Sequence, residues 1–300
     1  MRNAFIDELV QLARKHTHIA LVVGDLGFSV IEPFADEFPD RFVNAGVAEQ
    51  NMTGFAAGMA SEGYHVFTYS IANFPTFRCA EQIRNDVDYH KLPVTVVAVG
   101  GGLAYGPLGY SHHAVQDYAL MRTMPNMLIA APGDPFEVRA CIRYLIENPG
   151  PSYLRLGKAG EAVVHPNIPE VAPGRWLTIA GERGSPRALL STGAALGYAL
   201  NFYERRANCD CAVFSLPLWG MRSKSIQPTM AYAFDEIVTL EDHLVDGGFG
   251  SWLTESLVTT ERSPRVRPIA LAAEVCGTVG TQLTLNRLGG LDFINPASQV

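Results

Sequence analysis

The chain is organised around the stretch Asn44-Ala45-Gly46-Val47-Ala48-Glu49-Gln50-Asn51-Met52-Thr53-Gly54. A short β-type segment, 41–43, runs into this stretch, and a helix rich in small residues is predicted to leave it over 51–60. Small side chains allow such a helix to pack closely against a sheet or another helix. Glu49 therefore stands at a strand-to-helix junction, where a buried carboxylate needs a partner. Taken alone, Glu49 is better interpreted as a first-turn acid that the helix dipole stabilises.

On both sides of this junction, apolar runs bounded by turn signals alternate with helical patterns. This alternation is typical of a mostly parallel sheet with helices on its faces. Strands are predicted at 19–23, 66–70, 93–99, 127–130 and 152–156, and helices at 2–15, 31–37, 80–89, 114–121 and 135–147.

The character of the sequence changes near residue 160. Pro166, Pro169 and Pro173, with few long apolar runs between them, predict an extended linker at 161–183. A second α/β unit follows, with strands predicted at 188–191, 212–215, 236–240 and 268–271 and helices near 194–206 and 248–258. We therefore expect an α/β protein of two three-layer α/β/α domains with mostly parallel sheets, at 1–160 and 184–300.

Composition narrows the class of protein. The 300 residues are 48% hydrophobic and 18% charged, which suits two globular α/β domains. The net charge of −7 argues against nucleic acid or an anionic membrane as a partner. No apolar run reaches transmembrane length, and the acids in Met1–Glu8 do not fit a signal peptide. Five scattered cysteines, an odd number, predict reduced thiols and a cytoplasmic location.

The run Gly46-Val47-Ala48-Glu49-Gln50, followed by Ala56-Ala57-Gly58, resembles the pyrimidine-binding domain of the transketolase family of thiamine diphosphate enzymes. That family includes deoxyxylulose-phosphate synthase and the β subunits of 2-oxoacid dehydrogenases. The resemblance implies that Glu49 hydrogen-bonds N1′ of the cofactor's aminopyrimidine, favouring the tautomer whose 4′ nitrogen takes the proton from thiazolium C2. It extends to 241–250, which is similar to a strand-to-helix turn in the family's C-terminal domain and is expected to be structural.

Two further cofactor contacts follow from the resemblance. An aromatic residue of the 70–78 segment is expected to stack on the aminopyrimidine, and the spacing leaves Phe74 and Phe77 both open. Asp25 follows a predicted strand, and Gly24-Asp25-Leu26 resembles a family segment that approaches the cofactor. A turn aspartate that caps neighbouring N–H groups explains Asp25 equally well.

The histidines of Gly109-Tyr110-Ser111-His112-His113 match a family loop whose histidine reaches the substrate oxygens. Titration near neutrality suits His112 to moving a proton, and His113 is a secondary candidate for binding substrate. The family usually carries an aspartate, which holds a sugar hydroxyl, at the position that Leu108 occupies here. This departure predicts a less polar substrate site.

Three positions match the side of the family's site that holds a substrate phosphate. Lys158 replaces a family arginine, while Arg2 and Ser29 match two other contacts. Two cations and a hydroxyl suit an anionic group. Because lysine lacks the bidentate fork of arginine, the prediction is an anion rather than a phosphate in particular. Ordinary surface roles for Lys158 and Arg2 remain an open alternative.

One family motif does not occur in the sequence. Complete transketolases bind Mg²⁺ and the diphosphate through a domain marked by Gly-Asp-Gly, and neither Gly24-Asp25-Leu26 nor Gly133-Asp134-Pro135 has the third glycine. The chain is therefore expected to be the C-terminal part of a split enzyme. Its partner would be a diphosphate-binding subunit that holds Mg²⁺, in a two-fold heterotetramer in which this chain also associates with itself.

The resemblance implies transfer of a two-carbon ketol, or a related acyl unit, from a ketose or 2-oxoacid donor to an aldehyde by way of a thiamine-bound enamine. One alternative is a pyruvate-using, acyloin-forming carboligase like deoxyxylulose-phosphate synthase, which Leu108 favours. The other is a non-catalytic regulatory subunit, which the presence of both Glu49 and His112 argues against.

Overall fold

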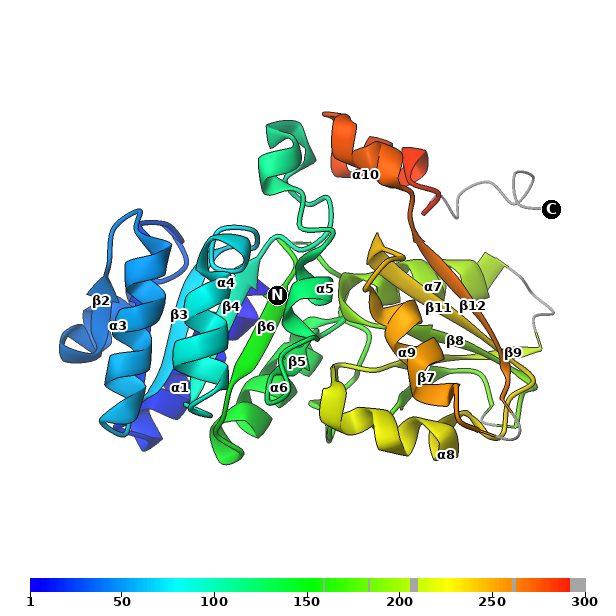
Figure 1. Cartoon of the computed structure of the whole chain (residues 1–300), viewed down its shortest axis with the longest axis horizontal. Helices are drawn as coiled ribbons and strands as arrows, with labels where there is room; N and C mark the ends of the chain where they lie inside the picture. Colours follow the sequence, from blue (N-terminus) through cyan, green and yellow to red (C-terminus); the bar gives the residue numbers. More distant parts are fainter. Residues whose placement is uncertain (159, 183, 206–209, 261–262, 292–300) are drawn as a thin grey trace.

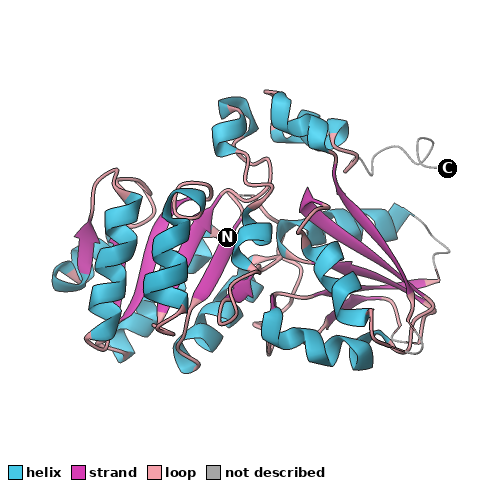
Figure 2. Ribbon diagram, in the orientation of Figure 1, coloured by secondary structure: helices cyan, strands magenta, loops and turns pink. Residues whose placement is uncertain are grey.

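The computed structural model describes residues 1–158, 160–182, 184–205, 210–260 and 263–291. Two twisted sheets lie side by side, and helices cover both faces of each (Figures 1 and 2). The α/β class and the mostly parallel sheets predicted from the sequence are confirmed.

The first sheet has seven strands in the order β10-β5-β6-β4-β3-β1-β2. All of its neighbouring strands are parallel except β10, which runs antiparallel to β5. Because both faces are covered by helices, the central strands are continuous apolar runs rather than alternating ones. The bounds are β1 (Ile19–Val23), β2 (Phe42–Asn44), β3 (His65–Ile71), β4 (Val94–Val99), β5 (Leu128–Ala130), β6 (Ser152–Leu156) and β10 (Leu218–Gly220).

The helices of the first unit divide between the two faces. One face carries α1 (Arg2–Lys15), α2 (Glu32–Glu37) and α6 (Pro135–Glu147), and the other carries α3 (Glu49–Ser61), α4 (Ala80–Gln82) and α5 (Asp117–Met121). Helix α6 begins where its sequence predicts, because the side chain of Asp134 accepts a hydrogen bond from the backbone N–H of Glu137 at 2.7 Å and Pro135 occupies the first turn. The helix predicted at 80–89 continues beyond α4 as a π-helical segment, Ile83–Asp88.

The second sheet has five strands in the order β12-β11-β8-β9-β7. It is parallel except for β7, which is antiparallel to β9. Its strands are β7 (Leu177–Ala180), β8 (Arg187–Ser191), β9 (Cys211–Ser215), β11 (Glu236–Leu244) and β12 (Arg265–Leu271), and its helices are α7 (Leu196–Arg205), α8 (Gln227–Ala231), α9 (Phe249–Leu257) and α10 (Gln282–Leu288).

Two short edge strands were not expected from the sequence. Strand β7 lies inside 161–183, and β10 crosses from the second unit to extend the first sheet. The two units also share a core, since the ring of Trp219 lies 5.1 Å from that of Tyr118 in the first unit and 5.1 Å from that of Trp252 in the second. Because edge strands this short carry almost no periodicity, pairing and packing identify them rather than pattern.

Among the described residues, no helix combines the length and apolar character needed to cross a membrane. Cys79, Cys141 and Cys276 are free thiols, whereas Cys211 is disulfide-bonded. The prediction of reduced thiols is therefore wrong at Cys211, because spacing alone does not reveal which sulfur atoms meet in the fold.

Candidate active site

The carboxyl ends of β1, β2 and β3 meet at Glu49, the first residue of α3. Its side chain is 1% exposed. One carboxylate oxygen, Oε2, accepts a hydrogen bond from Nη1 of Arg78 at 2.6 Å, and the other, Oε1, accepts one from the Ser70 hydroxyl at 3.3 Å. A Cβ at Gly24, just after β1, would lie 3.5 Å from Cγ of Glu49, so a small residue there leaves room for the carboxylate. The strand ends thus enclose a buried acid with one weakly bonded oxygen.

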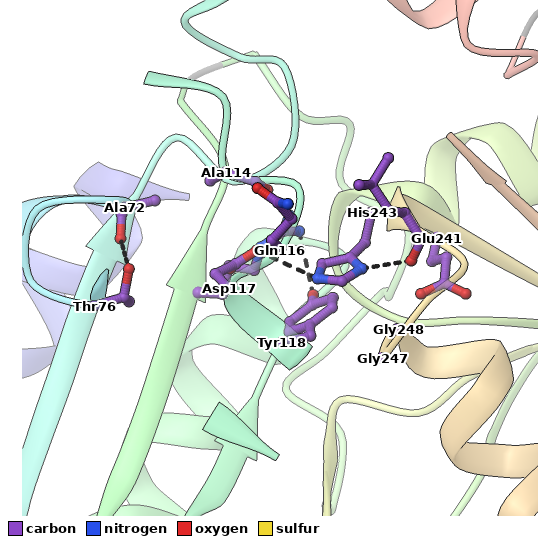
Figure 3. A network of polar contacts seen from close by, with 12 residues as sticks. Ala72, Thr76, Ala114, Gln116, Asp117, Tyr118, Glu241, His243, Gly247 and Gly248 are labelled. Carbon is purple, nitrogen blue, oxygen red and sulfur yellow. Dashed lines mark hydrogen bonds and ion pairs between the residues drawn. The ribbon is translucent and has the colours of Figure 1, made fainter. Parts of the chain in front are cut away.

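Phe74 is linked to this acid through Arg78. Its turn is closed by Thr76, whose hydroxyl donates to the carbonyl of Ala72 at 2.7 Å (Figure 3). The Arg78 guanidinium carbon lies 4.8 Å from the centroid of the Phe74 ring, a cation–π contact, while the side chain remains 46% exposed. Arg78 therefore bridges the Glu49 carboxylate and the Phe74 ring. Phe77 is 47% exposed, whereas Phe74 makes the contact with Arg78; which of the two rings stacks on the aminopyrimidine stays a prediction.

His112 approaches Phe74 from the loop after β4. The two ring centroids are 5.2 Å apart in an edge-on arrangement, and Tyr105 lies 6.4 Å from the same imidazole. Nδ1 of His112 pairs with the Ser111 hydroxyl at 2.9 Å, and Nε2 has no hydrogen-bond partner among the described residues. Burial, and then the nearby His113, lowers the pKa of His112. A neutral imidazole with one available nitrogen is suited to accepting a proton.

Two other candidates on this loop take different positions. His113 is buried inside the loop, where Nε2 lies 3.3 Å from the carbonyl oxygen of Gly106. Leu108 is 57% exposed. Asn73 ties the loop to the Phe74 turn, because its amide donates to the carbonyls of Ser111 at 3.2 Å and His113 at 2.9 Å. Of the two histidines, His112 is the one placed against Phe74.

The predicted anion-binding residues are partly brought together. Nε of Arg2 donates to the carbonyl of Lys158, whose ammonium lies 5.1 Å from the centroid of the Tyr105 ring. Burial raises the pKa of Tyr69 to about 12, and the adjacent Arg2 opposes this shift. Ser29 lies on a neighbouring loop, and its backbone N–H donates to the Glu32 carboxylate at 2.7 Å. Arg2 and Lys158 thus form one basic corner, and Ser29 has its own local partner.

Asp25 joins two strand ends. Its backbone adopts a left-handed conformation with φ 54°, and its carboxylate accepts a hydrogen bond from the side-chain amide of Asn44 at 2.9 Å. Its own N–H donates to the Asn44 side-chain oxygen at 3.1 Å. This pair fixes the end of β1 to the end of β2 just before the Glu49 helix. These contacts match the alternative in which Asp25 stabilises a turn. A contact between Asp25 and the cofactor stays a prediction.

Comparison with known proteins identifies the family. Residues 1–160 match the model of the transketolase pyrimidine-binding domain. The chain belongs to the transketolase family. It is 32% identical to a putative transketolase C-terminal section from Methanocaldococcus jannaschii, over 100% of this chain and 95% of that protein. It is also 32% identical to an apulose-4-phosphate transketolase subunit from Phocaeicola vulgatus, over 91% of this chain and 88% of that protein.

Solved structures agree with this assignment. A split-gene transketolase, named as an inactive β4 tetramer, superposes with a TM-score of 0.82 at 31% identity, covering 96% of this chain and 93% of that chain. A transketolase from Pichia stipitis superposes with a TM-score of 0.78 at 19% identity, over 97% of this chain but 43% of that chain, and supports the fold alone.

The described residues of this transketolase-family chain fit the pyrimidine end of thiamine diphosphate. Glu49 offers a buried carboxylate oxygen, Oε1, that is held at 3.3 Å by a single hydroxyl, and Phe74 offers an aromatic ring that contacts the same arginine, Arg78. A carboxylate oxygen can bond the pyrimidine ring nitrogen, and an aromatic ring can stack on the flat heterocycle. Within the described ranges, no group of three or more His, Cys, Asp or Glu residues is arranged to hold a metal ion.

Several site residues of this transketolase-family chain were missed by the sequence reasoning. Arg78, Ser70, Asn73 and Tyr105 all contact a predicted residue in the folded chain. Only Arg78 carried a usable signal, since it is a cation in the same segment as the two candidate aromatic residues. The others are residue types common in any loop, and only the fold brings them to the site.

Proposed function

We propose that this chain is the pyrimidine-binding subunit of a split transketolase, which transfers a two-carbon ketol unit from a ketose to an aldehyde. The observation that carries the proposal is the buried Glu49 carboxylate with Phe74 and His112 grouped beside it at the carboxyl edge of a parallel sheet. Ligands bind at that edge in open α/β folds. Fold alone would not justify an activity, and these three side chains supply the chemistry.

Thiamine diphosphate, when bound, supplies a thiazolium that accepts the electrons of the breaking carbon–carbon bond. Glu49 holds a proton at the pyrimidine ring nitrogen N1′ and so selects the ring tautomer. Phe74 stacks on the pyrimidine, which orients a flat ring at little entropic cost. His112 takes or returns a proton at a substrate oxygen through Nε2, because its other nitrogen is engaged by Ser111.

The basic corner formed by Arg2 and Lys158 would attract an anionic group at the far end of the substrate. Ser29 would add a hydroxyl from the neighbouring loop. Leu108 offers no acceptor to a sugar hydroxyl, so the proposed site favours donors that are less polar than ordinary ketose phosphates. The name of the relative from Phocaeicola vulgatus, an apulose-4-phosphate transketolase subunit, is compatible with a phosphorylated substrate.

We assign Mg²⁺ and the diphosphate of the cofactor to a separate partner subunit. Two observations support this assignment: Gly-Asp-Gly does not occur in the sequence, and the relatives are named as a C-terminal section and as one subunit of a transketolase. The expected assembly is a cytoplasmic heterotetramer with two copies of each chain, which has closed two-fold symmetry. The solved split-gene relative, an inactive β4 tetramer, suggests that this type of chain also associates with itself.

The test compares the chain alone with the chain plus a partner that carries Gly-Asp-Gly. Calorimetry measures thiamine diphosphate binding in the presence of Mg²⁺, and a coupled assay measures ketol transfer. We expect weak cofactor binding and no turnover for the chain alone, and both properties to appear on mixing. Tight cofactor binding with full activity in the lone chain would contradict the split-enzyme proposal.

A second candidate keeps the cofactor and changes the donor to pyruvate, as in an acyloin-forming carboligase. Leu108 favours it, and the chain is 30% identical to a 1-deoxy-D-xylulose-5-phosphate synthase from Methylacidiphilum infernorum over 85% of its own length and 41% of that protein. A donor screen of the reconstituted pair separates the two candidates. Carbon dioxide release from pyruvate, coupled to acyloin formation, would favour the second.

A further inference from the structure

The loop that carries His112 leaves the first sheet and projects above it. Its base is closed by an antiparallel bridge between Gly102 and Ala114, with two backbone hydrogen bonds of 2.9 Å. Between these residues lie two short 3₁₀ turns, Gly106–Leu108 and Tyr110–His112. Figure 1 shows this loop standing clear of the sheet next to α10, although the two segments are far apart in the sequence. Single 3₁₀ turns have little stability of their own, so the loop needs external support.

That support comes from the C-terminal segment 273–291, which contains the turn Ala273–Gly277 and helix α10. A Cβ at Gly106 would lie 2.6 Å from the carbonyl oxygen of Gly280 and 2.6 Å from Cδ1 of Leu285. The N–H of Gly280 donates to the carbonyl of Gly106 at 3.4 Å. A Cβ at Gly109 would lie 3.3 Å from Cγ2 of Val279. The loop backbone therefore lies directly on the C-terminal segment.

Apolar burial reinforces these contacts at the base of the loop. A buried cluster joins residues that flank the bridge to residues of the C-terminal segment and β12, namely Leu103, Val115, Leu271, Val275, Leu285 and Leu291. Leu285 is 0% exposed and belongs to this cluster while also touching Gly106. One side chain of α10 thus contacts the loop's first turn and packs with its base.

A short series of contacts connects Gly280 to the imidazole of His112. The Gly106 carbonyl that meets Gly280 also lies 3.3 Å from Nε2 of His113, the residue next to His112. On the opposite side, Asn73 holds the carbonyls of Ser111 and His113. The loop is therefore held from two sides, by the Phe74 turn and by the C-terminal segment.

We propose that the C-terminal segment 273–291 positions the His112 loop through Leu285 and Gly280, so that the second domain controls where the imidazole stands relative to Phe74. Leu285 is in this sense a positioning residue. The effect on turnover rests on the role proposed for His112, whereas the effect on the loop itself does not.

Amide hydrogen exchange on the full chain tests the positioning directly. In Leu285→Ala, the contact with Gly106 and part of the buried cluster are lost, so amides of 103–113 should exchange about tenfold faster or more. Amides of α3 should keep their exchange rates. The matched control is Leu283→Ala on the same helix, where the side chain is 52% exposed, and it should leave the loop unchanged. Leu285→Met conserves volume and should restore slow exchange.

Unchanged exchange of 103–113 in Leu285→Ala would overturn the proposal, and so would an equal acceleration in α3, which indicates general destabilisation. If Leu285→Ala does not fold, Gly106→Ala alters the same contact from the loop side. Its new methyl group meets a backbone oxygen and a side chain at 2.6 Å, and the same local acceleration is expected.

The second measurement uses the reconstituted pair. Leu285→Ala should lower kcat while the affinity for thiamine diphosphate stays at the wild-type value, because Glu49 and Phe74 lie outside the altered contact. Leu285→Met should recover kcat. Wild-type kcat in a Leu285→Ala enzyme whose loop exchanges faster would refute the link from loop to imidazole. Lack of turnover in the wild-type pair would instead refute the proposed function, and the exchange result would stand.

Discussion

Glu49 and Glu241 are both buried acids next to the start of a helix, and they are satisfied in different ways. The Glu241 carboxylate accepts hydrogen bonds from the backbone N–H groups of Phe249 and Gly250 at the start of α9. The Glu49 carboxylate is held by two side chains, Arg78 and Ser70. Backbone donors are fixed by the helix, whereas a side chain can rotate away. Glu241 is therefore saturated by its own fold, and Glu49 is available to a ligand.

The surroundings of the two acids also differ: those of Glu241 are buried, and those of Glu49 are partly exposed. Next to Glu241, the guanidinium of Arg155 is 2% exposed and pairs with Asp117 at 2.7 Å and Asp242 at 2.5 Å. His243 points from β11 toward Asp117, 4.0 Å away, and burial lowers its pKa to about 4 (Figure 3). Arg78, beside Glu49, is 46% exposed. A closed network joins the two units next to Glu241, whereas the network at Glu49 reaches solvent through Arg78.

The largest expected effect tests the open side of this comparison. Glu49→Gln should lower turnover of the reconstituted pair by about 100-fold or more, because an amide cannot exchange a proton with N1′. The thermal unfolding temperature of the lone chain should change little, since Gln keeps the shape of the side chain. Turnover near the wild-type value would show that Glu49 is no more functional than Glu241.

Glu241→Gln tests the closed side. Below the folded pKa of about 8 the acid is protonated, but both of its oxygens can still accept a hydrogen bond, whereas the NH2 group of Gln cannot, so the unfolding free energy should fall by about 1–3 kcal/mol. Chemical denaturation of the lone chain measures this loss. In the reconstituted pair, cofactor affinity should remain unchanged. A stability equal to that of the wild type would mean that the bonds to α9 do not distinguish this acid from Glu49.

The same variant gives a pH signature. Burial raises the pKa of Glu241 from 4.5 to about 8, against the effect of its two backbone hydrogen bonds. Between these values the folded chain binds a proton that the unfolded chain has released, so this contribution to stability decreases as pH rises through the window. Glu241→Gln should flatten that decrease. Because Asp242, Arg155 and His243 are present in both proteins, the difference between the two pH profiles isolates Glu241.

Arg78→Met should have a smaller effect. It removes the 2.6 Å bond to Glu49 and the cation over Phe74, so both groups lose orientation while the carboxylate remains. We expect turnover to fall about tenfold and the unfolding free energy to fall by about 1–3 kcal/mol, because the buried carboxylate of Glu49 loses its charged partner. Arg78→Lys is the control variant, because it keeps the positive charge and loses the planar guanidinium group. Full activity in both variants would show that Arg78 does not orient Glu49.

Leu108→Asp should have the smallest effect, since Leu108 belongs to neither acid's network and lies exposed on the His112 loop. The new carboxylate offers an acceptor to a sugar hydroxyl, so relative kcat/KM for a ketose phosphate over pyruvate should rise a few-fold, about 1 kcal/mol or less. A donor screen of both proteins measures the ratio. An unchanged ratio would remove Leu108 from the specificity argument.

Much of the fold could be predicted from local pattern. Helices α1 and α6 and strands β1 and β6 have the bounds that the sequence predicts, because apolar period and caps act within a few residues. Glu49 could be singled out for a similar reason: the glycine and alanine residues around it form a local pattern that resembles one family.

The contacts that complete the site are long-range, and pattern does not encode them. The sequence by itself determined the α/β class, the strand-to-helix junction at Glu49 and the composition of the loop that carries His112. Tertiary structure alone decided that Arg78 pairs with Glu49, that β10 joins the first sheet, and that Leu285 lies against Gly106. The physical reason is that burial periodicity fixes which face of an element turns inward, whereas the partner on that face is selected by chain topology and close packing.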